Sequence, residues 1–394
     1  MRGLVVPDAS EDFTADPVEL FFDLAYVFAF SQIVAILLDH PTWDAVGESA
    51  LIFLLLWLPW SQLTWSANAV AGNSRPARLL FLLATAASVP MAASIQTAFD
   101  ASGALFAIPL AVIFLSALGM MLTGAETGSE EFGSALRYAV PSTLAMAIIV
   151  VGGFLEDDAR VIAWIIGIVV FGYGTVRAGG STWILRAGHF AERHALIIIV
   201  ALGEVIVALG NSVAIPLGND GGFPANSVVA LVAAGILAGQ LWWAYFDRVR
   251  PAFEYRAEAL EGTERGRFAR DVYTYVHAPI VAGIILLAVA MEEMALHPSD
   301  PLPAAFRAMG FGGLLLYFGG VGLGVYRSYR VVAFERVAAV AVIGLLFLVG
   351  PDLSGVVLLV SIVAILFVAL AVEHVRIEKP RSIDDARVGD QASA

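Results

Sequence analysis

The chain of 394 residues contains 59% hydrophobic and only 14% charged residues, and its mean hydropathy is +0.82. Soluble domains average about 45–50% apolar and about 25% charged residues, so this composition excludes a water-soluble fold. The net charge of −13 argues against nucleic-acid binding, which uses basic patches to neutralise phosphates. The sequence has no cysteine, which excludes disulfides and thiolate metal sites, and its only lysine, Lys379, lies in the C-terminal tail. We therefore expect no cofactor.

Apolar segments of about 17 to 25 residues recur along the chain, and a helix needs this length to cross about 30 Å of hydrocarbon. Turn-forming residues separate the segments, for example Asp39-His40-Pro41. The sequence therefore predicts an all-α polytopic integral membrane protein that contacts the lipid bilayer along its length. Its twelve expected transmembrane helices are 18–38, 46–69, 76–98, 104–123, 134–154, 160–178, 193–214, 226–246, 268–291, 306–325, 334–350 and 354–374.

The distribution of Lys and Arg tests this count independently, because cationic residues are retained on the cytoplasmic side of a membrane. If the N-terminus is cytoplasmic, all of the 22 Lys and Arg residues except Arg160 and Arg307 fall on the cytoplasmic side. A missed or additional span would have scrambled this alternation. We therefore expect both termini in the cytoplasm.

The first expected helix has a well-marked start. Asp16 is a candidate N-cap, Pro17 suits the first helical position, and Glu19 lies in the first turn, where a carboxylate meets the positive end of the helix dipole. The residues before this helix are acidic and its apolar run has no small-residue cleavage pattern, so we expect no cleavable signal peptide.

A weak internal repeat relates the two halves of the sequence. Residues at matching places are Glu19 and Glu192, Gln62 and Gln240, Pro90 and Pro279, and Arg137 and Arg336. Each match by itself is weak, but the offset between partners grows steadily along the chain. We therefore expect cytoplasmic tails at 1–17 and 377–394, and two six-helix repeats at 18–180 and 181–376. An even number of helices gives both repeats the same orientation in the membrane.

Four segments carry a family resemblance. In chain order they are 17–24 (PVELFFDL), 189–193 (HFAER), 202–204 (LGE) and 241–247 (LWWAYFD). Together they resemble the bacterial low temperature requirement protein A family, over roughly residues 14 to 375. The resemblance implies a multi-pass protein of the bacterial inner membrane and supplies no reaction or substrate. A fainter similarity, at Phe22-Asp23, is to potassium channels built from two six-helix repeats.

Glu204 is the ionisable residue deepest inside an expected span. A charged group at the bilayer centre costs on the order of 2.5–3.5 kcal/mol on insertion scales, so it needs a partner or a function. Helical spacing places Arg193 and Asn211 on the same stripe as Glu204. Glu204 is a candidate for ion or proton handling, and the alternative is a buried carboxyl that ties two helices together.

Glu19 and Asp23 are four residues apart and share one helix face near the cytoplasmic end, where Arg residues can hold both ionised. Both are candidate pathway residues, and the alternative is helix capping with an ion pair. For Glu192, Arg193, Asp247 and Asp271, which lie at helix ends, we expect structural ion pairs.

His277 lies two residues before Pro279, so it is a candidate proton relay or a neutral histidine that binds a backbone carbonyl. His189 and His194 have no partner pattern for a metal, and we expect none. Gln62 and Gln240 occupy matching places in the two halves, and we expect them to face each other across a central cavity. The tryptophans near them, such as Trp57 and Trp60, fit a headgroup belt.

Three classes of function remain open. The first is a transporter or channel that moves a small solute or ion between the two repeats. The second is a membrane-embedded enzyme or cofactor protein, which the missing cysteine and body lysine disfavour. The third is a sensor or scaffold that acts through the Arg-rich loop at 248–270. The sequence does not give the oligomeric state, because the glycine-rich stretch 319–324 suits packing within one chain or between chains equally well.

The predicted topology can be tested with reporter fusions. Reporters placed after Asp100 or Gly218 should show periplasmic activity, whereas reporters placed after Gly262 or beyond Lys379 should show cytoplasmic activity. A cytoplasmic signal at Gly218 would contradict the twelve-helix topology.

Overall fold

The structure is a computed structural model that describes residues 14–70, 74–178, 183–219 and 224–392, without side-chain detail for 211–219 and 378–392. Within these ranges the fold is all-helical. Every predicted span coincides with a helix, although the helix ends differ by several residues. The helices are α1 (Pro17–Asp39), α2 (Trp43–Ala67), α3 (Arg75–Ala93), α4 (Gly103–Gly124), α5 (Glu130–Gly152), α6 (Asp157–Ala178), α7 (Ala187–Asn219), α8 (Ala225–Phe246), α11 (His277–Leu296), α12 (Ala304–Tyr329), α13 (Phe334–Val349) and α14 (Gly355–Ala392).

Eleven helical segments of the described chain are long and apolar enough to cross a membrane. The remaining helix, α13, has 16 residues and spans about 24 Å at 1.5 Å per residue, which is slightly short of a 30 Å hydrocarbon layer. The fold is therefore that of a multi-pass membrane protein, as the hydropathy pattern predicts.

The sequence did not predict the structure of the Arg-rich loop. Two short helices, α9 (Val249–Glu258) and α10 (Gly262–Phe268), fold there, and a π-helix, η2 (Ala269–Val276), joins α10 to α11. A single turn of 3₁₀-helix, η1 (Ile95–Thr97), follows α3. The π-helix lies just before Pro279, a residue that lacks the N–H of a regular helix.

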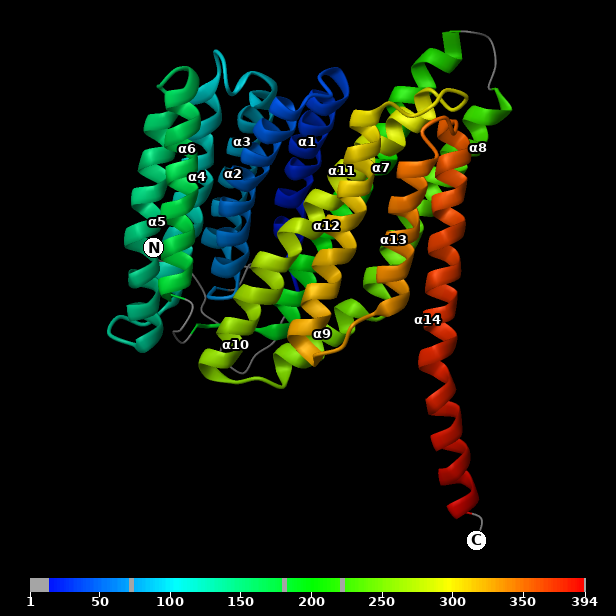
Figure 1. Ribbon diagram of the computed structural model, residues 1–394. Coiled ribbons are helices and arrows are strands. Elements are labelled where there is room, and N and C mark those ends of the chain that lie inside the picture. Colours follow the sequence, from blue (N-terminus) through cyan, green and yellow to red (C-terminus); the bar gives the residue numbers. More distant parts are fainter. Residues whose placement is uncertain (1–13, 71–73, 179–182, 220–223, 393–394) are drawn as a thin grey trace.

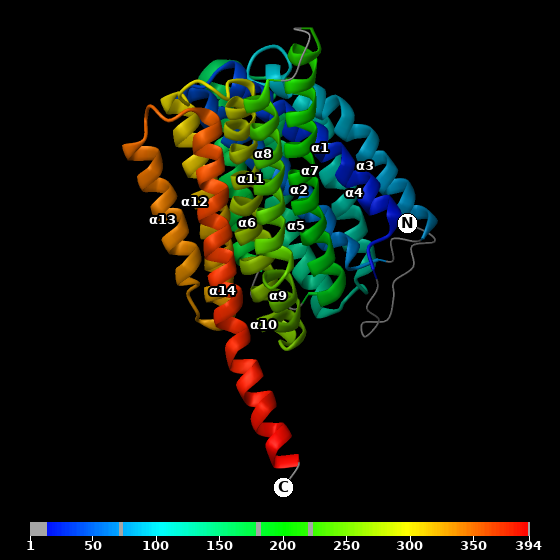
Figure 2. The same cartoon turned by 90° about the vertical axis from the view of Figure 1, so that its right-hand side faces the viewer.

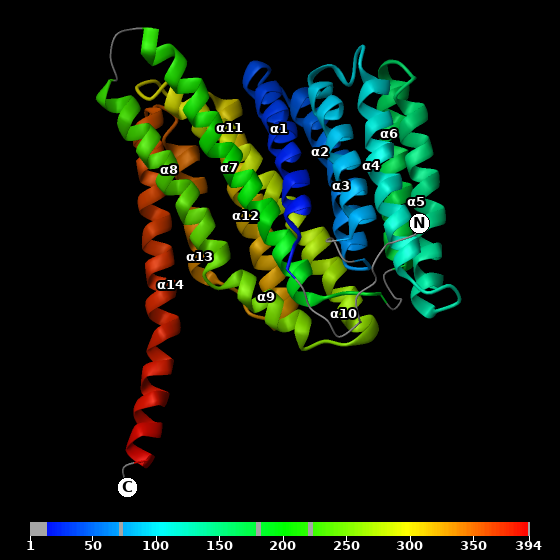
Figure 3. The same ribbon diagram turned by 180° about the vertical axis from the view of Figure 1, so that it is seen from behind.

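The helices form two groups, α1–α6 and α7–α14, that lie side by side (Figure 1). Helices α1, α7 and α11 pack against one another at the boundary, as the view from behind shows (Figure 3). In the view turned by 90°, the C-terminal part of α14 extends away from the bundle (Figure 2).

Part of the packing recurs between the two groups. Helix α1 packs on α3 as α7 packs on α11, α3 packs on α4 as α11 packs on α12, and α5 packs on α6 as α13 packs on α14. The second helices differ, because α2 packs mainly on α4 whereas α8 packs mainly on α14. The duplication therefore stays a prediction.

Polar and apolar residues are distributed as a bilayer requires. The helix α11 is the most buried, while α6 and α14 are the least buried and turn large apolar side chains outward. Buried charged residues such as Asp23, Arg193 and Arg336 lie inside the bundle, where other helices supply partners that lipid cannot.

The predicted start of α1 is confirmed. The Asp16 side chain accepts from Val18 N–H at 3.0 Å, and Glu19 accepts from Asp16 N–H at 3.1 Å, which completes a capping box with Pro17 at the first helical position. Burial opposes ionisation of Asp16, but hydrogen bonds from Arg78 and Val18 outweigh it, so the pKa of Asp16 lies below its ordinary value.

The two arginines that depart from the charge asymmetry are both held by backbone carbonyls. Arg160 is buried and donates to the carbonyls of Ala98, Asp100 and Leu155 at 2.7–3.0 Å. Arg307 donates to the carbonyl of Pro351 at 3.0 Å. Each arginine thus has a structural role at a loop, which accounts for its departure from the expected charge distribution.

Glycines allow α11 and α12 to approach closely. A Cβ added at Gly283 would lie 2.6 Å from the carbonyl oxygen of Gly313, and one added at Gly313 would lie 2.8 Å from that of Gly283. By contrast, Gly312 has open space at the corresponding position. Backbone contact of this kind provides the van der Waals packing on which helix association in lipid depends.

A matched pair of substitutions tests this contact. Gly313→Val should lower the melting temperature of the purified protein, because overpacking costs about 1–3 kcal/mol or more and a backbone cannot move aside easily. Gly312→Val, one residue earlier, should leave the melting temperature unchanged. Equal melting temperatures for the two variants in a thermal scan would contradict the close approach.

Candidate functional site

A buried ion pair joins α1 to α7 near the N-terminal ends of both helices. The guanidinium of Arg193 donates to Asp23 through Nη1 at 2.6 Å and Nη2 at 2.9 Å, in a bidentate arrangement. Arg193 is fully buried and Asp23 is 1% exposed. Trp60 of α2 adds a third bond, from its indole N–H to Asp23 Oδ1 at 2.9 Å. Such charge-assisted bidentate bonds fix the geometry of both partners.

Glu19 extends this ion pair into a network. Its carboxylate lies 3.4 Å from Arg193 Nε and 3.2 Å from His189 Nε2. Two carboxylates thus share one guanidinium, so Arg193 alone cannot neutralise them. Both α1 and α7 begin at this level, and the positive ends of their dipoles favour negative charge there. The helix ends and Arg193 together stabilise Glu19 and Asp23.

A cluster of aromatic and imidazole rings lies beside the network. The ring of His194 is 5.1 Å from the rings of both Tyr273 and His277 and 5.2 Å from that of Trp60. Its Nδ1 contacts the carbonyl of Phe190 at 2.9 Å, while its Nε2 is buried without a hydrogen-bond partner among the described residues. A carbonyl can only accept, so Nδ1 carries a hydrogen and donates it to Phe190.

The π-helix before Pro279 is stabilised by side chains. In a π-helix the carbonyl of Thr274 would accept from the N–H of residue 279, which is a proline. Trp57 donates its indole N–H to that carbonyl at 3.0 Å instead. His277 binds the carbonyl of Val272 at 2.9 Å through Nδ1, and its Nε2 lies 2.7 Å from the Tyr245 hydroxyl. His277 thus binds a backbone carbonyl, as one of its two predicted alternatives expects.

Glu204 lies in a cavity between the two groups of helices. The cavity has a volume of ≈ 520 Å³ and is lined by α1, α7 and α11, and a second acidic residue, Glu292 of α11, also lines it. The two glutamates are 2% and 4% exposed. On the α1 side the polar lining is Ser31 and Gln32. Within the described residues, Glu204 Oε2 has no hydrogen-bond partner.

Along α1 the cavity reaches the level of the ion network, because Leu24, which follows Asp23, lines it. Glu204 follows Arg193 by eleven residues on α7, which places them about 16 Å apart along the helix. Between them, Phe30, Ile198 and Ala201 are at most 1% exposed. Buried apolar residues therefore lie between the Glu204 carboxyl and the Arg193 guanidinium.

Comparison of the sequence with known proteins places this chain in a family. The family model of the bacterial low temperature requirement A protein (LtrA) matches residues 14–371. The chain belongs to the LtrA family. An uncharacterized protein from Rhizobium meliloti (strain 1021) is 29% identical over 377 residues, which cover 91% of this chain and 90% of the relative. No solved structure is significantly similar to the chain.

Two of the four segments that carried the resemblance meet in space. The first, 17–24, contributes Glu19 and Asp23, and the second, 189–193, contributes His189 and Arg193. These two segments are the ones that form the buried network. The third, 202–204, contributes Glu204 to the cavity.

The structure contradicts one prediction about the glutamines. Gln62 and Gln240 do not face each other, because Gln62 Nε2 contacts Ser66 at 3.1 Å and Met121 at 3.2 Å within its own half. Gln240 Nε2 donates to the carbonyl of Val363 on α14 at 2.9 Å. Each amide thus satisfies a group within its own half.

The predicted helix-end pairs are formed in part. Asp271 lies 2.6 Å from Arg270 and 3.2 Å from Arg327, and Asp247 lies 3.2 Å from Arg248. Glu192 does not pair with Arg193 and instead accepts from the N–H of Ala15 at 2.8 Å. The side chain of Asn211 lies outside the described residues. No group of three or more His, Asp or Glu in the described chain is arranged to hold a metal ion.

One site residue, Glu292, was missed in the sequence, and two tryptophans were misassigned. Glu292 was excluded because the predicted span ended at 291, whereas α11 continues to Leu296. The expected headgroup belt was wrong for Trp57 and Trp60, which are 6% and 0% exposed and donate to groups inside the bundle. A tryptophan two residues from a glutamine in an otherwise apolar span was the available signal for Trp60.

Removing the cation from the network should destabilise the protein strongly. Arg193→Met leaves two buried carboxylates uncompensated, and breaking a buried pair from one side costs about 3–5 kcal/mol. Thermal unfolding in detergent would measure the loss. The double variant Arg193→Met/Asp23→Leu should recover part of it, because the interaction energy between neighbours is not additive.

Arg78→Met is the matched control. Arg78 pairs with Asp16 at 2.9 Å, but half of its side chain is exposed, so its removal should change the melting temperature little. A loss at Arg193 no larger than that at Arg78 would show that the buried network does not stabilise the boundary between the halves.

Proposed function

We propose that this LtrA-family protein is a transporter that moves protons or a small cation through a pathway between its two halves, along α1, α7 and α11. The observation that carries the proposal is the cavity in which Glu204 and Glu292 face a common space inside the membrane-spanning region. Nothing in helix packing requires two buried acidic side chains in one cavity, and each is costly in hydrocarbon.

The chemistry of the cavity favours a cation. Two carboxylates that share a low-dielectric space repel each other when both are ionised, so a proton or cation between them lowers the free energy. Ser31 and Gln32 supply neutral oxygens on the opposite wall. Carboxylate and amide oxygens are suitable ligands for a hard cation that has lost part of its water shell.

The ion network provides a closure for the pathway. Arg193 holds α1 and α7 together through Asp23, at the level where the cavity lining ends at Leu24. Passage requires α1 and α7 to separate at this level or a relay of protons across it. Opening and closing on alternate sides of a fixed site is the usual mode of duplicated transporters.

The orientation follows from the arginine distribution. With both termini in the cytoplasm of the bacterial inner membrane, the network lies near the cytoplasmic face and the Glu204 cavity lies towards the periplasm. We favour transport over catalysis because the buried acidic residues line a cavity rather than surround a nucleophile or a metal site.

Neutralising Glu204 tests the proposal. Glu204→Gln keeps the shape and most of the hydrogen-bonding capacity of the side chain but removes the titratable proton, so the protein should fold normally. We expect it to abolish proton- or cation-dependent flux in proteoliposomes loaded with a pH-sensitive or cation-sensitive dye. Glu292→Gln should impair the same flux, because both residues line the cavity.

The control is Glu293→Gln, which makes the same change one residue along α11 at a side chain that does not line the cavity. Its flux should equal that of the wild type. Full flux in well-folded Glu204→Gln and Glu292→Gln proteins would show that the two carboxyl groups are structural.

A further inference from the structure

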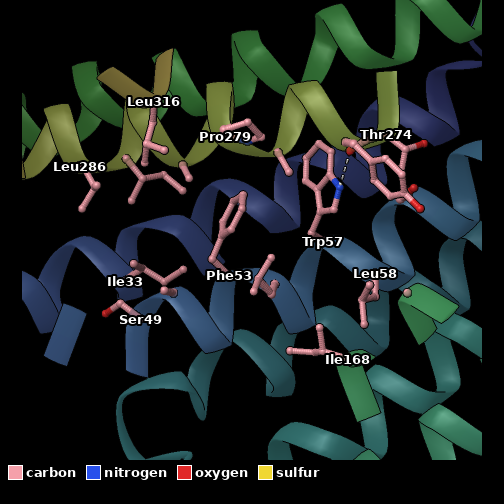
Figure 4. Close-up of a pocket in the computed structure, with 18 of the residues that line it drawn as sticks. Ile33, Ser49, Phe53, Trp57, Leu58, Ile168, Thr274, Pro279, Leu286 and Leu316 are labelled. Carbon is pink, nitrogen blue, oxygen red and sulfur yellow. Dashed lines mark hydrogen bonds between the residues drawn. The ribbon is translucent and has the colours of Figure 1, made fainter. Parts of the chain in front are cut away.

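A second cavity between the two halves is almost entirely apolar. It has a volume of ≈ 500 Å³, within the range of about 300–1,000 Å³ that ligand sites occupy. Phe53, Trp57 and Ile168 line one wall, and Pro279, Leu286 and Leu316 line the other (Figure 4). We call this space the interhalf cleft. None of the residues that line it lines the Glu204 cavity.

The interhalf cleft is long and opens towards lipid. Its lining on α2 runs from Val46 to Ser61, which is about 22 Å of helix and most of the hydrocarbon thickness. Leu54 and Leu316 at its rim are 41% and 38% exposed. Such a rim inside a membrane-spanning region contacts acyl chains rather than water.

A narrower space continues the cleft to the predicted cytoplasmic side. It shares Ser61, Thr175 and Thr274 with the cleft and is also lined by Arg270. The continuation is small, with a volume of ≈ 50 Å³. The apolar cleft therefore ends at a cation.

The charges at this end are unbalanced. Asp271 contacts both Arg270 and Arg327, so one carboxylate faces two guanidinium groups. The guanidinium of Arg270 also lies 5.8 Å from the centre of the Tyr275 ring. Tyr275 in turn contacts Thr175 of the other half at 2.6 Å, which fixes the mouth of the cleft. An anionic group here would complete the charge balance.

We propose that the interhalf cleft binds an anionic phospholipid of the cytoplasmic leaflet, with one acyl chain in the cleft and the headgroup phosphate at Arg270. The apolar walls select a hydrocarbon chain, and the excess positive charge selects a negative headgroup. Basic pockets between transmembrane helices on the cytoplasmic side recognise anionic lipids in this way. The proposal is independent of transport through the Glu204 cavity.

A filling variant tests the chain site. A Cβ at Gly172 of α6 would meet no atom within 4 Å, and Gly172 lines the cleft, so Gly172→Phe places a ring in the cleft without a backbone clash. The protein would be purified from mixed phosphatidylglycerol and phosphatidylcholine vesicles, and native mass spectrometry would count the retained lipids. We expect the wild type to retain phosphatidylglycerol and Gly172→Phe to lose it.

A charge variant tests the headgroup site. Arg270→Gln should reduce the preference for phosphatidylglycerol over phosphatidylcholine about fivefold, the effect of one arginine near an anionic headgroup. Asp271 would still contact Arg327 in this variant, at 3.2 Å, so its charge stays paired.

Matched controls make each outcome decisive. Gly239→Phe adds the same ring at an open position on α8. Arg75→Gln removes the same charge at the start of α3. Neither residue lines the cleft or its narrow continuation. Both should retain lipid as the wild type does. Retention of phosphatidylglycerol by monodisperse Gly172→Phe, or equal retention of the two lipids by the wild type, would overturn the proposal. Lipid counts do not depend on flux, so a failure of the transport proposal would be seen separately.

Discussion

The bidentate pairing of Arg193 with Asp23 is the constraint on which the boundary between the halves depends. A guanidinium inside a membrane has no water to return to, so its two bonds to Asp23 determine where α1 lies against α7 and in which register. Residues of α2 and α7 complete the site through Trp60 and His189. Helices that are distant in sequence are thus joined by one fully buried cation.

Because α1 is held at this end, the space that each of its two faces lines farther along the helix is determined as well. Ser31 and Ala35 lie on the side of the Glu204 cavity, whereas Ile33 and Leu37 line the interhalf cleft. Helix α1 is therefore the wall between an acidic cavity and an apolar cleft. An amphipathic helix of a soluble protein has one apolar face and one face in water. Helix α1 instead has one face that lines the acidic cavity and one face that lines the apolar cleft.

Local physical rules predicted much of the fold. The hydropathy of each span and the capping residues at Asp16 and Pro17 depend on neighbours in sequence, so the helices and the start of α1 were predictable. Arg193, Glu19 and Asp23 were recognised as costly groups that need partners. Helical periodicity gives the face on which a residue lies but not the helix that this face meets, so the pairing of Arg193 with Asp23 was not predictable.

The errors have the same origin. The matching places of Gln62 and Gln240 indicated a shared role, but each amide bonds to the nearest acceptor or donor of its own half. The two consecutive glutamates, Glu292 and Glu293, resembled the end of an apolar span, because hydropathy cannot distinguish a carboxylate in a cavity from one in water. A sequence lists the groups that must be satisfied in a membrane, and only the packing of distant helices determines which group satisfies which.

Helix α11 shows how one element can serve both spaces. Its first turns follow a π-helix whose Thr274 carbonyl is held by Trp57, and these turns line the interhalf cleft, while Glu292 near its other end lines the acidic cavity. Glycine contacts with α12 along its length make the helix a rigid part of the second half. A displacement of α11 relative to α1 therefore changes the width of the cleft and the surroundings of the Glu204 carboxylate together. A chain that fills the cleft resists that displacement, because any narrowing would have to expel apolar atoms that pack against both halves.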